Sequence, residues 1–422
     1  MVQVCVLGLG YIGLPTASMF ATHGLRVLGV DVNHKVVAVL NGGDIHIEEP
    51  GLKTVVAAAT KSGNLTIDTQ PRPAEAFIIA VPTPINADKT ADMRYVVSAA
   101  ESIVPHLQKG NLVILESTSP PRTTVDLVQP ILERSGLKAG TDFGLAYSPE
   151  RVLPGRILHE LVENSRVIGG IDDASAQAGR DLYATFVRGE IVLTDATTAE
   201  MVKLMENTYR DVNIAIANEF ARLAARFGIN VWEAIQIANR HPRVEILRPG
   251  PGVGGHCISV DPWFLVEVAP ALAQLIRQAR NVNDGQPAYV VAGLQARFGS
   301  LEDKTFAVLG VTFKANVDDT RESPAIDVIH HLQQAGAQVR AFDPHVKQCH
   351  ELGAALVGAL SEALDGADGV LLLVDHREFE TLDAATLGTH LRQRWILDTR
   401  NMLDRAAWVD AGFEVALLGK NQ

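Results

Sequence analysis

A glycine-rich turn near the start of the chain constrains the fold more than any other feature. Residues 2–7 are apolar enough for a buried strand, and Gly8, Gly10 and Gly13 follow at once in the spacing G-x-G-x-x-G. A helical pattern begins directly after the turn, at residues 15–23. In this context glycines allow a tight turn, and the amides at the helix start can bind a pyrophosphate. We therefore expect a βαβ nucleotide-binding unit at this end of the chain.

An acidic residue indicates which nucleotide is bound. Asp31 follows a second expected strand, residues 26–30, at the distance from the glycines that dinucleotide-binding folds use. A carboxylate there accepts hydrogen bonds from ribose hydroxyls and repels a 2′-phosphate, so the pattern favours NAD over NADP. The alternative is a glycine turn with a capping aspartate and no ligand, and it is disfavoured because strand, helix and acid occur together.

Strands alternate with helices at both ends of the chain, which predicts parallel sheets. The middle differs: residues 197–227 form one helical segment without Gly or Pro, and residues 271–298 form another with a possible break at Pro287. We expect an α/β protein with two Rossmann-like doubly wound domains, joined by a central helical domain with a long connecting helix. Further strands are expected at residues 77–81, 112–115, 143–146, 306–310, 339–342, 370–374 and 395–397, a helix at 324–334, and domains at 1–194, 195–298 and 299–422.

Length and charge limit the possible functions. A chain of 422 residues is too long for a single core, and its net charge of −12 argues against nucleic acid or anionic lipid as a partner. No apolar run approaches the ~18 residues that a membrane span needs, and the chain enters its first strand without the pattern of a secretory signal. Three widely separated cysteines favour a reducing compartment, so we expect a cytoplasmic protein.

Two short motifs follow expected strands of the first half. V-P-T-P at residues 81–84 and E-S-T at residues 116–118 would lie at the carboxyl edge of the sheet, where doubly wound folds bind ligands. Thr83 and Thr118 could line a cofactor there. By themselves these are ordinary turn residues, and that reading would stand without the other motifs.

Cys257 is the best candidate nucleophile. It lies in P-G-P-G-V-G-G-H-C-I-S-V-D-P at residues 249–262, whose glycines let the backbone approach a ligand closely. Cys5 lies inside the first strand as a small core residue, and Cys349 lies in an ordinary helical context. A thiol beside a nicotinamide could trap an aldehyde as a thiohemiacetal, pass a second hydride to leave a thioester, and release an acid by hydrolysis. The alternative is a buried cysteine in a tight turn.

Polar and cationic residues occur around this loop. Lys203, Asn207 and Arg210 share one face of the long helix, where a lysine could move protons and an amide could hold water or an oxyanion. The alternative for that face is a solvated stripe. His241, Arg243 and Arg248 place local positive charge just before the glycine-rich loop, and phosphate is its natural partner. A second possible anion site is formed by Lys314, Arg321 and a Ser-Pro helix start. Taken singly, these are common surface residues.

Together the motifs resemble the nucleotide-sugar 6-dehydrogenase family over nearly the whole chain. The resemblance rests on GLGYIGLP (8–15), VPTP, EST, SPERV (148–152), EMVKLMENTYRDVNIAIANE (200–219), GPGVGGHCISVDP (250–262), GVTFKANVDDTRESPA (310–325) and DTRNML (398–403). It implies an NAD-binding domain, a central helical domain used for dimerisation, and a UDP-sugar-binding domain. It also implies NAD-dependent, four-electron oxidation of a sugar C6 alcohol by a homodimer.

The resemblance assigns roles to particular residues. Cys257 is the nucleophile, Lys203 the catalytic lysine, Asn207 the water-positioning amide, Asp261 its supporting carboxylate and Glu150 the acid/base or water-handling group, with Thr118 beside them. Cofactor contacts are implied for Gly8, Gly10, Tyr11, Ile12, Gly13, Asp31, Val81, Thr83, Thr118 and Arg321. Substrate contacts are implied for Glu150, Arg151, Val152, Lys203, Asn207, Arg210, His241, Arg243, Gly254, Phe313, Lys314 and Arg400. No residue is assigned to a metal.

The identity of the sugar is read from residues 240–265. This stretch is most similar to the branch of the family that oxidises UDP-N-acetyl-D-mannosamine to the mannosaminuronate for surface polysaccharides. Val260 stands where UDP-glucose enzymes commonly carry Lys, and residues 151–153 also depart from their pattern. UDP-N-acetylglucosamine and UDP-glucose remain alternatives. A two-electron hydroxyacid-type dehydrogenase is disfavoured by Cys257, and a non-catalytic nucleotide sensor is disfavoured because both Cys257 and Lys203 are present.

Overall fold

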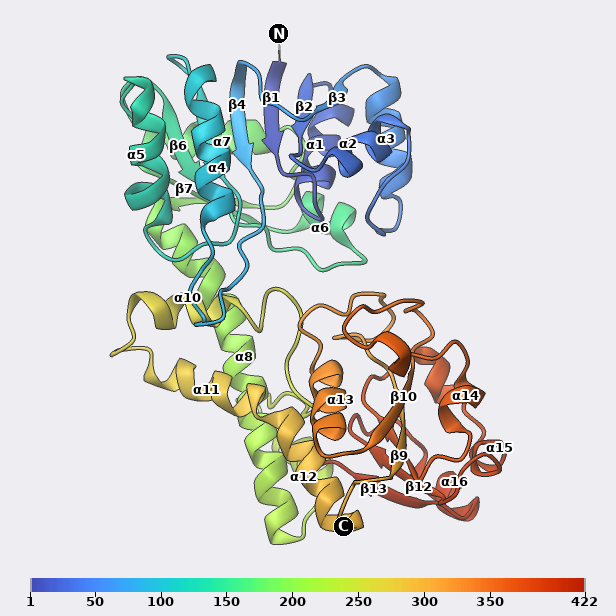
Figure 1. The fold of residues 1–422 in the computed structure, drawn as a ribbon. Helices are drawn as coiled ribbons and strands as arrows, with labels where there is room; N and C mark the ends of the chain where they lie inside the picture. Colours follow the sequence, from blue (N-terminus) through green and yellow to red (C-terminus); the bar gives the residue numbers. More distant parts are fainter. Residues whose placement is uncertain (1, 421–422) are drawn as a thin grey trace. The chain divides into compact units, whose positions relative to one another are not determined.

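The computed structural model describes residues 2–420 and forms two compact units, which are considered separately (Figure 1). The first unit contains the described residues up to Glu206 together with Trp263–Pro270. The second contains Asn207–Pro262 together with the described residues from Ala271 onwards. Each unit has its own sheet, which confirms the predicted α/β class with two Rossmann-like parts. The limits of the three expected domains remain a prediction.

The first unit contains an eight-stranded sheet in the order β3-β2-β1-β4-β5-β6-β7-β8. All neighbouring pairs are parallel except β6 with β7. Chain order reverses between β1 and β4, and the carboxyl ends of strands at such a reversal form a ligand-binding crevice. The strands are β1 (Val2–Leu7), β2 (Val27–Val30), β3 (Leu65–Asp68), β4 (Ala74–Ile79), β5 (Leu112–Leu115), β6 (Gly144–Tyr147), β7 (Arg166–Gly170) and β8 (Ile191–Asp195).

Alternate residues of these strands build two apolar layers. Val4 and Val6 of β1 join one buried cluster, whereas Cys5 and Leu7 join the cluster on the opposite face. The first cluster is covered by α1 (Gly13–Thr22), α2 (His34–Asn41), α3 (Leu52–Lys61), α6 (Ile157–Glu163) and α7 (Asp173–Tyr183). The second is covered by α4 (Arg94–Ile103), a π-helical turn (Thr123–Val128) and α5 (Gln129–Leu132).

The second unit contains a five-stranded parallel sheet in the order β10-β9-β11-β12-β13. Its chain order reverses between β9 and β11. The strands are β9 (Thr305–Leu309), β10 (Gln338–Phe342), β11 (Gly369–Leu372), β12 (Trp395–Asp398) and β13 (Glu414–Leu417). One face packs on α12 (Gln286–Phe298) and α13 (Pro324–Gln334), and the other on α14 (Leu360–Leu364), α15 (Ala384–Gly388) and α16 (Arg405–Asp410).

The expected long helix is α8 (Ala196–Phe227), and it continues from the first unit into the second. The helical middle also contains α9 (Val231–Ala238), α10 (Asp261–Val268) and α11 (Gln274–Asp284). The break expected at Pro287 occurs two residues earlier, at Gly285, because proline fits the first turn of the following helix. The expected helical setting of Cys349 is wrong: this thiol is buried in a loop, and burial raises its pKa.

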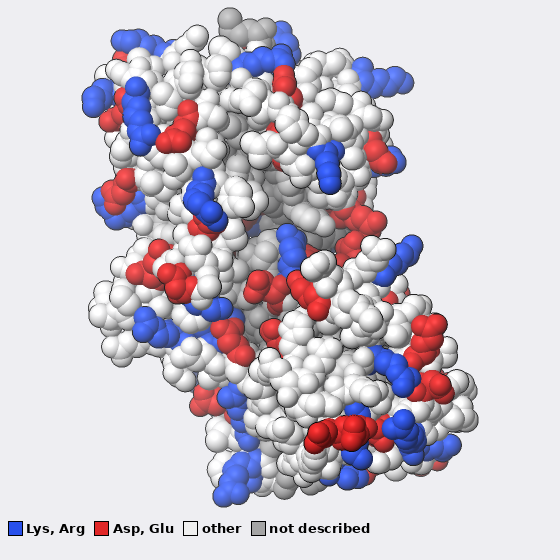
Figure 2. Space-filling view, in the orientation of Figure 1, with Lys and Arg blue, Asp and Glu red and all other residues white. Residues whose placement is uncertain are grey.

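Charged side chains of both signs are interspersed on the face that Figure 2 displays. Among the described residues visible there, Lys and Arg form no extended basic patch. The excess of acidic residues over basic ones is therefore not concentrated in one block on this face. Within residues 2–420, none of the helices is long and apolar enough to cross a membrane.

Candidate active site

The glycine turn lies at the carboxyl end of β1, inside the crevice of the first unit. A Cβ atom on Gly13 would lie 1.8 Å from the carbonyl oxygen of Gly8, whose φ of +91° itself favours glycine. A Cβ atom on Gly10, by contrast, would meet nothing within 4 Å. The residue preceding α1, Ile12, provides no side-chain cap for the helix amides. The turn therefore offers an open space beside helix amides that no side chain caps, which suits an anion.

Asp31 directly follows β2 and lies beside the glycine turn. Its Oδ2 accepts a hydrogen bond from the amide of Leu9 at 3.0 Å, and its Oδ1 accepts one from the amide of Asn33 at 2.8 Å. These bonds fix the carboxylate at the end of β2 while leaving it partly exposed. The open turn and the partly exposed acid together fit the dinucleotide that the sequence predicts.

The two threonine motifs meet beside this crevice. Thr83 donates its hydroxyl to the carbonyl oxygen of Thr118 at 2.6 Å, and Ser117 donates to the carbonyl oxygen of Val81 at 2.7 Å. The loops after β4 and β5 are therefore tied to each other, as expected for neighbouring strands. Thr83, Thr118, Val81 and Tyr11 are each partly exposed and can contact a ligand.

Glu150 belongs to a buried ionic cluster that sequence reasoning missed. Arg166, the first residue of β7, donates from Nη2 to Glu150 Oε2 at 2.8 Å and from Nη1 to Glu116 Oε1 at 3.1 Å. Tyr183 donates its hydroxyl to the same oxygen of Glu116 at 3.0 Å. Burial raises the pKa of Glu116 to about 7, against the opposing effect of the Arg166 charge. The sequence signal was slight: Glu116 is the first residue of the E-S-T motif, and Arg166 lies in no motif.

Cys257 is half-buried in a tight turn that opens α10. The amide of Asp261 donates to the carbonyl oxygen of Cys257 at 2.8 Å. Asn207 on α8 donates from Nδ2 to Asp261 Oδ2 at 2.5 Å. The second unit thus brings three of the predicted catalytic residues together. This arrangement combines a partly exposed thiol with an amide oriented by a carboxylate.

The other two residues of the α8 stripe differ in exposure. Lys203 is only 8% exposed and belongs to the first unit, whereas Arg210 is exposed and belongs to the second. A solvated stripe therefore describes Arg210 but not Lys203, because an ammonium group is seldom so deeply buried without a function or a partner.

The second crevice lies at the carboxyl ends of β9 and β11. Its lining includes Phe313, Lys314 and Arg400 together with Pro324, the first residue of α13. Arg400 donates from Nε to Asp375 Oδ1 at 3.0 Å, and both side chains remain about one third exposed. The crevice therefore carries partly exposed cations, as expected for a site that binds phosphate.

The glycine-rich loop packs against this crevice within the same unit. A Cβ atom on Gly254 would lie 2.2 Å from the carbonyl oxygen of Glu322 and 2.9 Å from Cβ of Phe313. Glycine is required at this position because the loop backbone lies directly on these residues. The loop that carries Cys257 is therefore part of the wall of the second crevice.

Two buried aspartates shape the segments that carry the cations. Asp398 accepts the amides of Arg400, Met402 and Leu403, which forms the turn presenting Arg400. Asp343 pairs with His376 at 2.9 Å, and Nδ1 of His376 accepts the amide of Asn316 at 3.0 Å next to Lys314. His376 also belongs to a set of three residues that could bind a metal, together with His345 and Glu378. Both nitrogens of His376 are already hydrogen-bonded, which argues against that use.

The remaining predicted contacts lie nearer the surface. His241 and Arg243 are exposed in the loop after α9. Arg151 pairs with Glu206 at 2.7 Å, next to the partly exposed Val152, and Arg321 pairs with Asp319 at 2.6 Å. Their roles toward ligands remain predictions.

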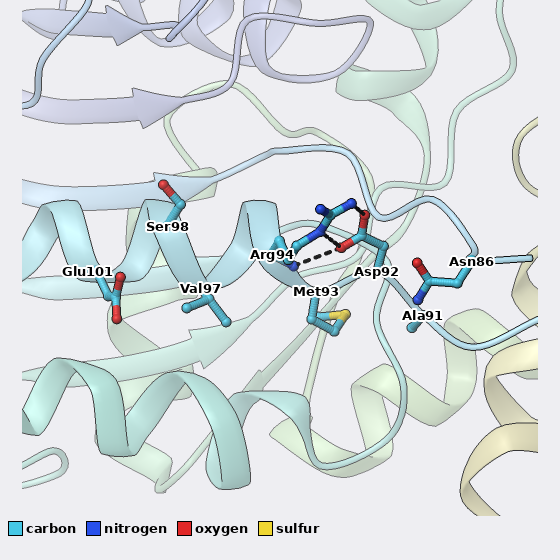
Figure 3. Close-up of a pocket in the computed structure, with 8 residues that line it drawn as sticks. All are labelled: Asn86, Ala91, Asp92, Met93, Arg94, Val97, Ser98 and Glu101. Carbon is cyan, nitrogen blue, oxygen red and sulfur yellow. Dashed lines mark hydrogen bonds and ion pairs between the residues drawn. The ribbon is translucent and has the colours of Figure 1, made fainter.

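A separate open pocket of about 500 Å³ lies where α4 begins (Figure 3). The guanidinium of Arg94 points to Asp92 there and binds both of its oxygens. None of the predicted site residues lines this pocket, and its main cation is already paired. We assign it no part in the chemistry.

Comparison with known families agrees with this geometry. The NAD binding domain of the UDP-glucose/GDP-mannose dehydrogenase family matches residues 2–187, its central domain matches 197–285, and its UDP binding domain matches 307–405. These matches follow the order of the first sheet, the helical middle and the second sheet.

Individual relatives match the chain almost end to end. A UDP-N-acetyl-D-mannosamine dehydrogenase of Methanococcus maripaludis is 49% identical over 99% of this chain and 97% of its own length. An NDP-N-acetyl-D-galactosaminuronic acid dehydrogenase of Ralstonia solanacearum is 48% identical over 94% of this chain and 96% of its own. The solved structure of a UDP-D-ManNAc dehydrogenase from Pyrococcus horikoshii superposes with a TM-score of 0.92 at 42% identity, covering 99% of both chains.

Proposed function

Because this chain belongs to the UDP-glucose/GDP-mannose dehydrogenase family, we propose that it oxidises C6 of UDP-N-acetyl-D-mannosamine to a carboxylate with two NAD⁺. Membership makes it an NAD-dependent enzyme acting on a nucleotide sugar. The proposal is carried by one observation: Cys257, Asp261 and Asn207 are held together at the end of the glycine-rich loop. A two-electron alcohol dehydrogenase has no use for such a thiol.

The proposed chemistry has two oxidations and one hydrolysis. Lys203 receives the proton of the C6 hydroxyl in the first oxidation, and NAD⁺ bound at the glycine turn supplies the hydride acceptor. Cys257 Sγ then attacks the aldehyde to form a thiohemiacetal, whose oxidation leaves a thioester. Asn207, oriented by Asp261, donates to the oxyanion, and Glu150 holds the water that releases the acid and the thiol. One alcohol and one water thus give one carboxylate, two NADH and three protons.

Separate groups hold the two ligands in this proposal. The open glycine turn, Asp31 and the tied threonine loops support NAD binding in the first unit. Lys314 and Arg400 support binding of the diphosphate in the second unit. The resemblance implies further ligand contacts, which are retained in this proposal: Arg321 with the cofactor, and Arg151, His241 and Arg243 with the substrate.

Support for the mannosamine sugar comes from the relatives and from Val260. The most similar relatives include enzymes named for N-acetylmannosamine and for N-acetylgalactosaminuronic acid, so an N-acetylated sugar is common to both. Val260, one of the departures from the UDP-glucose pattern, lies in the same turn as Cys257 and is buried.

The deciding experiment counts NADH formed per sugar supplied in limiting amount. UDP-N-acetylmannosamine, UDP-N-acetylglucosamine, UDP-N-acetylgalactosamine and UDP-glucose are run in parallel with excess NAD⁺. We expect two NADH from the mannosamine sugar alone. Two NADH from another sugar alone would reject UDP-N-acetylmannosamine as the substrate but would still support oxidation through Cys257. One NADH from every active sugar would reject the role of Cys257.

Cys257→Ser tests the covalent step directly. The variant should bind both ligands but fail to complete the second oxidation and hydrolysis, because an alkoxide is a poor leaving group compared with a thiolate. Calorimetry measures binding, and mass spectrometry looks for a sugar adduct on the protein. Turnover at the wild-type rate would contradict covalent catalysis.

We also propose that the protein is a homodimer formed through α8. Apolar side chains recur on one face of this helix at helical spacing and remain exposed: Met205, Tyr209, Ile216, Phe220, Leu223 and Phe227. Tyr209 is 71% exposed, which is unusual for an aromatic ring beside other apolar residues. A second copy of this helix would bury these exposed apolar side chains. Cytoplasmic location stays a prediction from cysteine usage.

Light scattering on a sizing column tests the assembly. The wild-type protein should elute with twice the mass of one chain, and Phe220→Glu should shift it toward the monomer because a charge in an apolar interface is costly. Glu219→Gln, at the adjacent position on another side of the helix, is the control. A monomeric wild-type protein would reject the dimer.

A further inference from the structure

We propose that Arg166 is a positioning residue that holds the Glu150 carboxylate for hydrolysis of the Cys257 thioester, with Glu116 and Tyr183 holding Arg166 in turn. This role rests on the proposed function. It concerns buried charged groups that the mechanism above does not otherwise use.

The geometry of the cluster is that of a forked donor between two acceptors. Nη2 of Arg166 lies 2.8 Å from Glu150 Oε2, and Nη1 lies 3.1 Å from Glu116 Oε1 and 3.0 Å from Ser148 Oγ. The guanidinium carbon lies 4.1 Å from the centroid of the Tyr183 ring. A planar guanidinium held by acceptors on both arms and a ring on its face has one orientation.

Four separate elements contribute to this cluster. Glu116 follows β5, Glu150 follows β6, Arg166 begins β7 and Tyr183 ends α7. Arg166 therefore ties the loop that carries Glu150 to the loop that carries Thr118, two residues after Glu116. A displacement of Arg166 would move a predicted catalytic group without unfolding any single element.

Charge balance explains how one cation serves two carboxylates. Arg166, Glu116 and Tyr183 are buried, as is Glu150 with 9% exposure, so a net negative charge there would be costly. The groups facing Glu116 are Arg166, Glu150 and Tyr183. Because burial raises the pKa of Glu116 to about 7, this carboxyl is partly protonated near neutral pH. When Glu116 is neutral, the positive charge of Arg166 pairs with the Glu150 carboxylate alone.

The consequence is a carboxylate held in one orientation in the loop after β6. The second oxygen of Glu150, Oε1, accepts the amide of Arg151 at 2.5 Å, so neither oxygen is left without a donor. A carboxylate fixed in this way can accept a proton from a water molecule only along defined directions. In the hydrolysis the water oxygen forms a bond to the thioester carbon, the C–S bond breaks, and the water proton passes through Glu150 to the departing thiolate.

Arg166→Lys in the whole chain tests this role, because a lysine keeps the charge but loses the two-armed guanidinium. Rapid mixing with excess NAD⁺ follows the two oxidations, and quenched mass spectrometry follows the thioester on Cys257. We expect both oxidations within about twofold of wild type. Hydrolysis should slow by about 10- to 100-fold, which corresponds to one charge-assisted hydrogen bond, and the thioester should accumulate. Arg188→Lys, which changes an exposed pair with Glu163, is the matched control.

Rescue separates positioning from a purely structural role. Glu116→Gln keeps an oxygen for Arg166 and Tyr183 but removes the negative charge that helps to hold the guanidinium, so it should slow hydrolysis less than Arg166→Lys does. In Arg166→Lys combined with Glu116→Gln, the single cation serves Glu150 alone, and we expect partial recovery of hydrolysis. Losses equal in all three steps and parallel to the loss of thermal stability would reject the positioning role.

A conservative variant keeps the test decisive if Arg166→Lys does not fold. Tyr183→Phe preserves the ring beneath the guanidinium and removes only the bond to Glu116, and it should slow hydrolysis by severalfold with both oxidations unchanged. Wild-type hydrolysis in this variant and in every folded Arg166 variant would overturn the role of Arg166. A wild-type protein that yields no NADH from any nucleotide sugar would overturn the proposed function itself, and this role with it.

Discussion

The two crevices of this protein begin with the same construction. In the first unit Asp31 accepts the amide of Leu9 through Oδ2 at 3.0 Å, and in the second Asp343 accepts the amide of Val311 through Oδ2 at 2.7 Å. Each aspartate directly follows the second strand of its sheet along the chain and fixes the turn after the first strand. The two α/β halves are therefore built on one local scheme.

They differ in what remains for a ligand. Asp31 is partly exposed, whereas Asp343 is buried and pairs with His376, so only the former can contact a ribose. The helix after the first turn, α1, has no side-chain cap, whereas Ser323 caps α13 with a bond to the amide of Ala325. One crevice thus offers backbone donors and an acid.

Charge in the second crevice comes from side chains instead. Lys314 and Arg400 line it, and Phe313 contributes an aromatic surface. Backbone recognition depends on the absence of Cβ atoms, and side-chain recognition depends on charge. The two sites should therefore fail under different substitutions and respond differently to salt.

The largest effect is expected for Gly13→Ala, which adds a Cβ atom to the glycine turn of the first crevice. The new Cβ would overlap the carbonyl oxygen of Gly8, so the turn and the start of α1 must shift. Because a shift of ~1 Å in a site costs about 100-fold, kcat/KM for NAD⁺ should fall by at least that factor. Steady-state kinetics and calorimetry with NAD⁺ measure it.

Binding of UDP by the second unit should be unchanged in that variant. Gly293→Ala in α12 is the control, because its Cβ would meet nothing within 4 Å and alanine favours helix. Equal loss of NAD⁺ and UDP binding in Gly13→Ala would break the separation between the two sites.

The next largest effect is expected for Arg400→Ala, which removes a cation from the second crevice. Loss of a charge-assisted hydrogen bond should weaken UDP binding by about 10- to 100-fold and reduce its dependence on salt. Calorimetry at low and high salt measures both quantities, with NAD⁺ affinity as the internal reference. Asp375→Asn is the matched control, since it removes the acid that pairs with Arg400 and should leave UDP binding equal or tighter. Unaltered UDP affinity in Arg400→Ala would contradict side-chain recognition.

The first crevice could be predicted from local sequence patterns, whereas contacts between residues far apart along the chain could not. Gly8, Gly13 and Asp31 lie in one contiguous βαβ stretch, where spacing along the chain determines spacing in the fold. The ion pair of Arg166 with Glu116 joins residues 50 positions apart, and no local pattern encodes such a pair. The long helix was readable because α8 contains neither Gly nor Pro.

Errors arose where local context misled or was absent. Cys349 has helix-compatible neighbours, yet tertiary packing places it in a buried loop. Strand β8 was not among the expected strands; it lies at the sheet edge and none of its residues is buried. The catalytic loop was found through Cys257, but its packing against Phe313 required the structure.

A smaller effect is expected for the two equivalent aspartates. Asp31→Ala should weaken NAD⁺ binding by about tenfold, roughly one hydrogen-bond contribution, and relax the discrimination against NADP⁺. Asp343→Ala should leave both cofactor properties unchanged and lower the melting temperature, because it removes the carboxylate that pairs with the buried His376. Affinities for NAD⁺ and NADP⁺, with thermal melts of each variant, make the comparison. A change of cofactor selectivity in Asp343→Ala would contradict the assignment of roles.

The smallest effect is a contrast in pH dependence between buried acids of the two units. Burial raises the pKa of Glu116 to about 7, so its contribution to stability is fully present below the ordinary glutamate pKa and is lost as pH rises through about 7. Burial acts to raise the pKa of Asp343, but the hydrogen bond and charge of His376 and the amides of Val311 and His345 together lower that pKa. Stability there is therefore lost only as pH falls into the acid range. Glu116→Gln should therefore melt higher than wild type at pH 8 by a few degrees, at ~2–4 °C per kcal/mol, and lose this advantage by pH 5. An advantage that is the same at both pH values would mean that Glu116 does not titrate in this range.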